Sequence, residues 1–309
     1  MIGFVLAAGF GTRLRPITYH MPKALVPVGG IPMLGRMLDD FASSGFTSLG
    51  ANIHYRPYDI SIFCDNYPHP VTLFHEKETI RGTGGALYFA RDFLAGDDSF
   101  CIRNVDILSD IDLENLKARF KASGSDCMLI AAPARDSGSI CMDTQNGEYR
   151  GLPRQNCKGQ QCKGVDYIGL SFYSKRFLSL VKEDDFSLVP VWKRAADEGM
   201  TVVVHEIERL YWRDIGTPQS LAEIHFDMLD QKFSFTLPQE YVCDFDKKRA
   251  YHRGVESHKQ LLGPYSWCDA KSLSGKHSYD HCLIWEDSSS DHTRHSDAII
   301  TPWGEMNLE

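Results

Sequence analysis

The chain has 309 residues, of which 43% are hydrophobic and 24% are charged. It is long enough to bury a full core, as one large domain or as a large domain with a smaller one. Its formal net charge of −8 argues against a surface built for nucleic acid or an anionic membrane, because such partners require a basic field. Any phosphate that the chain binds must therefore be met by a local site.

Cysteine use and hydropathy indicate the compartment. The nine cysteines are an odd number scattered along the chain, which predicts reduced thiols and a cytoplasmic location rather than a disulfide framework. The apolar stretch 2–8 is too short to span a bilayer, has no basic flank and runs into a glycine turn. We therefore expect no targeting or membrane segment.

The first half of the chain alternates short apolar runs with amphipathic stretches. The strands we expect are 2–7, 47–53, 71–75, 99–103 and 126–132, and the helices are 32–44, 56–65, 83–95 and 112–123. Helical connections of this kind are crossovers, so the sheet should be mixed but mostly parallel, between helical layers. Further along the chain we expect strands at 165–173 and 201–206 and helices at 174–182, 188–198 and 217–231. The fold class predicted for residues 1–235 is an α/β three-layer sandwich.

Residues 236–309 have a different pattern and are expected to form a short β-rich C-terminal extension. Helical periodicity ends near Pro238, and short apolar triplets begin at Cys282 and Ala298. Their separation is close to one coil of a β-solenoid. Two alternatives stay open, a degenerate left-handed β-helix and an irregular β extension.

The most informative stretch follows the first strand. Two alanines and two glycines, residues 7–9 and 11, precede Arg13, and Pro22-Lys23 follows shortly after. Bare backbone N–H groups here can face a phosphate, with fixed charge added by Arg13 and Lys23. The dinucleotide pattern Gly-x-Gly-x-x-Gly fails because its third glycine is Leu14, and the P-loop pattern is absent from the sequence. A tight turn after an edge strand is the purely structural alternative.

These residues closely resemble the signature of the sugar-1-phosphate nucleotidyltransferase family. The shared motif is Leu6-Ala-Ala-Gly9-x-Gly11-Thr12-Arg13-Leu14-x-Pro16-x-Thr18, with Pro22-Lys23-x-Leu25. The resemblance covers roughly residues 1–232 and implies the Rossmann-like fold of that family. It also implies that the phosphates of a nucleoside triphosphate (NTP) are stabilised by catalytic Arg13 and Lys23. The remaining nucleotide-binding residues implied are Leu6, Ala7, Ala8, Gly9, Gly11 and Thr12.

A second glycine cluster starts at Gly82 and Thr83, before an amphipathic stretch. Small residues at a helix start leave N–H groups available to an acceptor. The cluster resembles the family segment that contacts the nucleobase, which implies this role for Gly82 and Thr83. A plain helix entry is the alternative.

Two aspartates are the expected metal ligands. Asp106 ends an apolar strand at the edge where ligands collect in open α/β sheets, and Mg²⁺ takes one or two carboxylates together with phosphate oxygens. Asp214 lies in an Asp-Ile-Gly-Thr-Pro run that resembles the late metal motif of the family. The family usually has glycine where this chain has Val105. Thr217 is better placed than Asp214 to cap the next helix.

Asp110 and Asp112 form an Asp-x-Asp pair. Such a pair holds the diphosphate of a nucleotide-sugar in metal-dependent glycosyltransferases. The competing interpretation, which we favour, is that both residues cap the helix 113–123.

The sequence motifs for sugar binding match the family pattern less closely. Gly138, Tyr167 and Gly169 resemble the family's contacts to the hexose. The family's Glu-Lys-Pro segment is missing, and Arg154 could replace its lysine on the sugar phosphate, as could Lys158 or Lys163. The Gly-Thr-Gly-Gly segment at residues 82–85 and the missing Glu-Lys-Pro are similar to the mannose-1-phosphate guanylyltransferase and muramate-1-phosphate uridylyltransferase branches.

The resemblance implies an Mg²⁺-dependent enzyme whose partners are an NTP and a sugar 1-phosphate, and it is compatible with a homo-oligomer. It would transfer a nucleoside monophosphate to the sugar phosphate and release pyrophosphate. Two alternatives are a non-catalytic regulatory homologue that binds nucleotide-sugar and the glycosyltransferase that uses Asp110 and Asp112.

Overall fold

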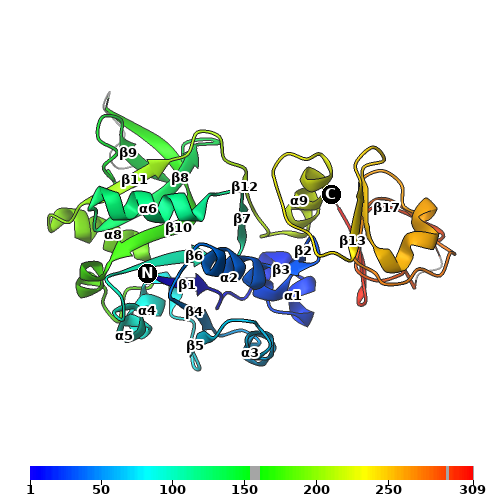
Figure 1. Cartoon of the computed structure of the whole chain (residues 1–309), viewed down its shortest axis with the longest axis horizontal. Coiled ribbons are helices and arrows are strands. Elements are labelled where there is room, and N and C mark those ends of the chain that lie inside the picture. Colours follow the sequence, from blue (N-terminus) through cyan, green and yellow to red (C-terminus); the bar gives the residue numbers. More distant parts are fainter. Residues whose placement is uncertain (154–160, 290–291, 309) are drawn as a thin grey trace. The chain divides into compact units, whose positions relative to one another are not determined.

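The computed structural model describes residues 1–153, 161–289 and 292–308 (Figure 1). The chain forms two compact units. Unit 1 comprises residues 1–10, 21–25 and 34–212, and unit 2 comprises residues 11–20, 26–33 and 213–309. The sequence therefore passes back and forth between the units within its first 34 residues.

Unit 1 is built on an eight-stranded sheet with the order β11-β8-β10-β6-β1-β4-β5, to which β9 adds by pairing with β10. Neighbours pair in parallel except around β10, which is antiparallel to β6, β8 and β9. The mixed, mostly parallel sheet is thus confirmed. The strands are β1 (Ile2–Leu6), β4 (Ser48–Ile53), β5 (Val71–His75), β6 (Ser99–Asn104), β8 (Cys127–Pro133), β9 (Ile140–Asp143), β10 (Cys162–Ser174) and β11 (Val202–Glu206).

Helices cover both faces of this sheet. On one face, a Cβ added at Gly3 of β1 would lie 2.7 Å from the Phe41 ring, and Phe172 of β10 stacks on Phe120. On the other face, Phe4 joins a core that includes Leu94 and Trp192. Successive strand residues point to opposite faces, so three layers follow. The helices are α2 (Met33–Ser43), α3 (Pro57–Asp65), α4 (Gly82–Phe89), α5 (Arg91–Leu94), α6 (Leu113–Ser123) and α8 (Leu188–Asp197).

Two expected helices differ in detail. The helix expected at 83–95 is interrupted at Ala90, whose ψ of 7° ends α4 before α5 begins. The segment expected as helix 174–182 is a 3₁₀ run, η3 (Lys175–Leu180). Only Phe177 of that run is buried, so it lacks the apolar stripe that would dock a longer α-helix.

Unit 2 has its own six-stranded sheet, in the order β13-β14-β15-β16-β17-β18. From β14 to β17 consecutive strands pair in parallel, and one row of partners runs Ala250, Trp267, Leu283 and Ile299. Stacking of consecutive strands in this way is typical of a solenoid. The strands are β13 (Tyr241–Asp244), β14 (Arg249–His252), β15 (Ser266–Cys268), β16 (Ser278–Ile284), β17 (Arg294–Thr301) and β18 (Gly304–Asn307).

The rest of unit 2 comes from both ends of the chain. Near the N-terminus it contains η1 (Thr12–Leu14), α1 (Ile17–His20) and the small hairpin of β2 (Pro27–Val28) and β3 (Ile31–Pro32). Helix α9 (Pro218–Leu229) packs on the C-terminal strands through Phe226, whose ring stacks on His281 at 4.2 Å. α9 therefore groups with the C-terminal strands, and the predicted division at residue 235 stays a prediction.

Two observations concern the cysteines and the hydropathy of the helices. Cys141 is disulfide-bonded, so the expectation of reduced thiols is wrong at this position, because cysteine spacing does not show which thiols come within bonding distance. In the part of the chain that the structure describes, no helix has the length and apolar character needed to cross a bilayer. The free cysteines in that part are Cys64, Cys101, Cys127, Cys162, Cys243, Cys268 and Cys282.

Candidate active site

The first part of the glycine loop continues directly from β1 in unit 1. The backbone N–H of Ala7 donates to Oδ1 of Asn52 at 2.9 Å, and both Ala7 and Ala8 are buried. Gly9 is exposed, and a Cβ added there would meet no atom within 4 Å. The main chain at Gly9 thus borders open space, as a segment expected to receive a ligand requires.

Lys23 and Asp106 meet at this carboxyl edge of the sheet. Lys23 starts the short helix η2 (Lys23–Leu25), and Asp106 lies in the turn between β6 and β7 (Ile107–Ser109). The ammonium nitrogen of Lys23 is 2.6 Å from Oδ2 of Asp106, and Lys23 is only 8% exposed. The carboxylate partner offsets part of the cost of burying the ammonium group. Two residues expected to have separate roles are therefore neighbours.

Sequence reasoning missed a buried polar network beside the loop. Asn52, near the end of β4, donates through Nδ2 to Oε1 of Glu76 at 2.8 Å. The other carboxylate oxygen of Glu76 accepts from the backbone N–H of Arg81 at 2.7 Å. Both side chains are nearly inaccessible, so the network ties the Ala7 segment to the entry of α4. Glu76 follows β5 in the same way as Asp106 follows β6. This position after an apolar strand is the sequence signal from which Glu76 could have been predicted.

The Gly82-Thr83 segment starts α4, as expected, but its small residues also serve packing. A Cβ added at Gly84 would lie 2.4 Å from the carbonyl oxygen of Asp185. The hydroxyl of Thr83 accepts from the backbone N–H of Leu188 at 3.0 Å. The cluster therefore holds the loop before α8, and its contact with a base stays a prediction.

Unit 2 contains the other half of the glycine loop. Gly11 has φ +63°, a left-handed conformation that favours glycine, and its carbonyl accepts from Leu14 N–H at 2.9 Å and from the Thr18 hydroxyl at 2.8 Å. These two hydrogen bonds close the turn that carries Thr12 and Arg13.

The side chains of Arg13 and Asp214 both lie next to Gly216. Oδ1 of Asp214, at the end of β12 (Trp212–Asp214), accepts from the backbone N–H of Gly216 at 2.6 Å. A Cβ added at Gly216 would lie 2.4 Å from that oxygen and 2.6 Å from Nη2 of Arg13. A side chain at this position would therefore require both groups to shift. Thr217, not Asp214, caps α9, by accepting from Ser220 N–H at 3.1 Å, as expected.

The two carboxylates of the Asp-x-Asp pair accept hydrogen bonds from the backbone. Asp112 is the N-cap of α6 and accepts from Asn115 N–H at 2.9 Å, which confirms the capping interpretation for Asp112 but not for Asp110. Asp110 does not cap the helix and instead accepts from Tyr211 N–H at 2.9 Å. Both carboxylates thus already have backbone partners.

The predicted sugar residues of unit 1 are largely engaged in packing. The Tyr167 ring lies against Trp192 at 5.0 Å, its hydroxyl is 3.0 Å from that of Ser171, and burial raises the pKa of the phenol. A Cβ added at Gly138 would lie 2.5 Å from Val165 N, and one at Gly169 would lie 2.9 Å from the Asn104 side chain.

The candidate cations on the sugar side fall into two groups. Lys163 forms an ion pair with Glu206. Arg154 and Lys158 lie outside the described residues. The sugar contacts therefore stay predictions.

Asp106 and Asp214 each carry a carboxylate of the kind that magnesium takes. Among residues 1–153, 161–289 and 292–308 no cluster of three or more His, Cys, Asp or Glu side chains could hold a metal. Mg²⁺ does not need such a cage, since it is held by one or two carboxylates and completes its shell with phosphate oxygens and water. Asp106 and Asp214 offer hard oxygen donors of this type, each with one oxygen bonded to a neighbouring group.

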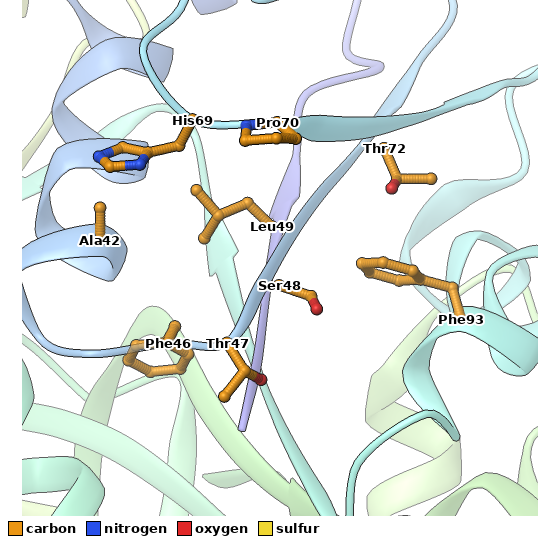
Figure 2. A pocket seen from close by; sticks show the side chains of 9 residues that line it. All are labelled: Ala42, Phe46, Thr47, Ser48, Leu49, His69, Pro70, Thr72 and Phe93. Atoms are coloured by element: carbon orange, nitrogen blue, oxygen red, sulfur yellow. The ribbon is translucent and has the colours of Figure 1, made fainter.

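A separate pocket of about 340 Å³ opens at the amino-terminal ends of β4 and β5 (Figure 2). The rings of Phe46 and Phe93 and the hydroxyls of Ser48 and Thr72 line it. None of the described residues that line it is Lys or Arg, and it lies at the opposite end of these strands from the glycine loop.

The fold and these motifs define a class of enzyme. The family model described as "Nucleotidyl transferase" matches residues 2–139. The mannose-1-phosphate guanyltransferase of Gibberella zeae is 31% identical over 255 residues, which cover 78% of this chain and 69% of that protein. The chain belongs to the sugar-1-phosphate nucleotidyltransferase family.

Other comparisons agree. The mannose-1-phosphate guanyltransferase of Candida albicans is 26% identical over 71% of this chain, but the chain spans only 62% of that relative. The crystal structure of a proposed glucose-1-phosphate thymidylyltransferase from Bacillus anthracis, in complex with sucrose, has a TM-score of 0.64 at 20% identity. The structural match covers 76% of this chain and 98% of the Bacillus anthracis chain, and it shows the shared fold.

Proposed function

We propose that the chain transfers a nucleoside monophosphate from an NTP to a sugar 1-phosphate, giving a nucleotide-sugar and pyrophosphate. The observation that carries the proposal is the pair of Lys23 and Asp106, 2.6 Å apart at the carboxyl edge of the sheet. A buried cation and a metal-binding carboxylate are the groups that phosphoryl chemistry needs at one place. The open main chain at Gly9 supports the same site.

In the proposed reaction, an oxygen of the sugar phosphate forms a bond to the α-phosphorus of the NTP. The bond from that phosphorus to the oxygen bridging the α- and β-phosphates breaks, and pyrophosphate leaves. Lys23 and Arg13 stabilise the charge on the phosphates, and the backbone around Ala8 and Gly9 orients the nucleotide. The attacking phosphate is already an anion, so no general base is required.

Mg²⁺ is the proposed cofactor, with Asp106 and Asp214 as the residues that would hold it. When bound, it would neutralise phosphate charge and help to align the two substrates. We also propose that the reaction takes place in the cytoplasm. The homo-oligomer stays a prediction.

GTP and mannose 1-phosphate are the first substrate pair to test. The relatives from Gibberella zeae and Candida albicans are both mannose-1-phosphate guanyltransferases. Their identities of 31% and 26% leave room for a different base or sugar, so the pair belongs in a wider panel.

The test is a panel of GTP, UTP, CTP, dTTP and ATP against mannose, glucose and N-acetylmuramic acid 1-phosphates, with Mg²⁺ and pyrophosphate as the readout. We expect one pair to release pyrophosphate and nucleotide-sugar in equal amounts. Release of nucleoside diphosphate from a nucleotide-sugar would instead indicate the glycosyltransferase. Binding of nucleotide-sugar with no turnover for any pair would indicate the regulatory homologue.

A further inference from the structure

The C-terminal hairpin, formed by β17 and β18, covers the segment that follows the turn carrying Arg13. We call residues 16–20 the arm; it consists of Pro16 and helix α1. The indole ring of Trp303, between β17 and β18, stacks on the His20 ring with centroids 4.2 Å apart and planes within 4° of parallel. Trp303 is 42% exposed, so the rest of its surface is covered, and a cavity of about 70 Å³ is bounded by the arm and the hairpin. Stacked rings of this size fix the arm by contact area rather than by charge.

The turn at Trp303 is itself held in place. The hydroxyl of Thr301 donates to the carbonyl of Gly304 at 2.8 Å and accepts from the backbone N–H of Trp303 at 3.2 Å. β18 then pairs antiparallel with β17. The indole is therefore presented to His20 by a hydrogen-bonded turn at the edge of a sheet, not by a loose terminus.

The arm also fixes the conformation of the turn that carries Arg13. Ile17 and Thr18 are each 1% exposed, and the Thr18 hydroxyl reaches back to the carbonyl of Gly11 at 2.8 Å. The backbone N–H of Leu14 donates to the same carbonyl at 2.9 Å. A displacement of the arm would therefore break the hydrogen bond that closes the turn and would move Arg13.

A second contact of the same kind holds residues 26–33, which follow Lys23 in the sequence. The backbone N–H of Gly29 donates to Nε2 of His225 on α9 at 3.0 Å, and Nδ1 of His225 is 2.8 Å from the carbonyl of Leu221. The His225 ring also packs edge-on against Trp267 of β15 at 5.0 Å. The C-terminal part of the chain thus holds the segments on both sides of Lys23 in the sequence.

We propose that Trp303 is a positioning residue for NTP binding. By stacking on His20 it fixes the arm, and through Thr18 it fixes the turn that presents Arg13 to the phosphates. The inference rests on the proposed function, because it takes an NTP as the ligand of that turn. It gives the C-terminal strands an indirect part in substrate binding, through the arm.

The first experiment compares the full-length wild type with Trp303→Ala, Trp303→Phe and Tyr58→Ala by titration with Mg·GTP. Tyr58 is a suitable control because it is 82% exposed on α3. We expect Trp303→Ala to weaken Mg·GTP binding about tenfold, Trp303→Phe to restore most of it, and mannose 1-phosphate binding to stay within about twofold. Wild-type GTP affinity in Trp303→Ala, or no rescue by phenylalanine, would overturn the proposal.

The second experiment needs neither turnover nor nucleotide. Hydrogen exchange should be faster at the amides of Leu14 and Tyr19 in Trp303→Ala than in the wild type, with the β16 amides unchanged as evidence of intact folding. Unchanged exchange at Leu14 and Tyr19 would overturn the positioning role. If no substrate pair releases pyrophosphate but Trp303→Ala still weakens Mg·GTP binding, the proposed reaction fails while the positioning role stands.

Discussion

Lys23 and Asp106 lie 83 positions apart in the sequence, yet the ammonium nitrogen of one is 2.6 Å from a carboxylate oxygen of the other. The contact joins the signature segment to the turn after β6. The contact places a cation and a carboxylate together before substrate arrives, so the site is preorganised for phosphate and metal. Substitutions at this pair should therefore affect catalysis more than folding.

Asp106→Asn should lower turnover by about 10²-fold or more, because the amide is neutral and is a poor ligand for Mg²⁺. The melting temperature should change little, since Asn keeps an oxygen that can accept from Lys23. The matched control is Asp110→Asn, because the Asp110 carboxylate accepts from the backbone N–H of Tyr211. A wild-type rate for Asp106→Asn at saturating Mg²⁺, or a dead Asp110→Asn, would reverse the assignment.

Gly216→Ala should be as damaging as the loss of a charged residue. The new methyl group would lie 2.4 Å from Oδ1 of Asp214 and 2.6 Å from Nη2 of Arg13, so both must move. We expect kcat/KM to fall about 10²-fold while circular dichroism stays native. Steady-state kinetics with purified variants would measure this, and unchanged kinetics would mean that neither side chain needs its present position.

Gly9→Ala tests the opposite situation. No atom lies within 4 Å of the added Cβ, and the φ of Gly9 is not in the left-handed region, so the fold should tolerate alanine. The open space is expected to be filled by the nucleotide, so the KM for the NTP should rise about tenfold or more while the KM for sugar 1-phosphate stays constant. An equal rise in both KM values would show that the methyl group disturbs the fold instead.

The strands and the glycine loop could be predicted because apolar periodicity and small residues are local signals. The Lys23 and Asp106 contact could not, because it depends on the paths of two loops in space. Glu76 and Asn52 carried the same signal as Asp106, a polar residue at the carboxyl end of an apolar strand, but no motif drew attention to them. Tyr167 shows the reverse case, since a residue expected at the sugar packs its ring against Trp192.

Asn52→Leu should destabilise unit 1 and weaken nucleotide binding together. Leucine would leave the Ala7 N–H and the buried Glu76 carboxylate without their present partner. Burying unpaired polar groups costs about 1–3 kcal/mol for each group. Urea unfolding should show this loss, and Asn52→Gln, which keeps both an acceptor and a donor, should lose less. Equal stability of Asn52→Leu and wild type would show that the network is not structural.

Asp269 gives unit 2 a stability that depends on pH. Burial raises the pKa of this carboxyl group to about 6, and the indole N–H of Trp267, which donates to Oδ1 at 2.8 Å, offsets only part of the effect. Between about pH 4 and 6 the folded chain therefore keeps a proton that the unfolded chain has released, so stability falls as pH rises through this window. Above it, a buried charge costs up to about 3 kcal/mol.

Asp269→Asn should remove this cost, because the amide keeps an oxygen for Trp267 and carries no charge at any pH. The variant should melt several degrees above the wild type at pH 7.5, and the difference should vanish at about pH 4, where the wild-type carboxyl is protonated in the folded chain. Thermal melts of both proteins across this range would measure it. A constant difference at all pH values would mean that packing, not ionisation, separates the two proteins.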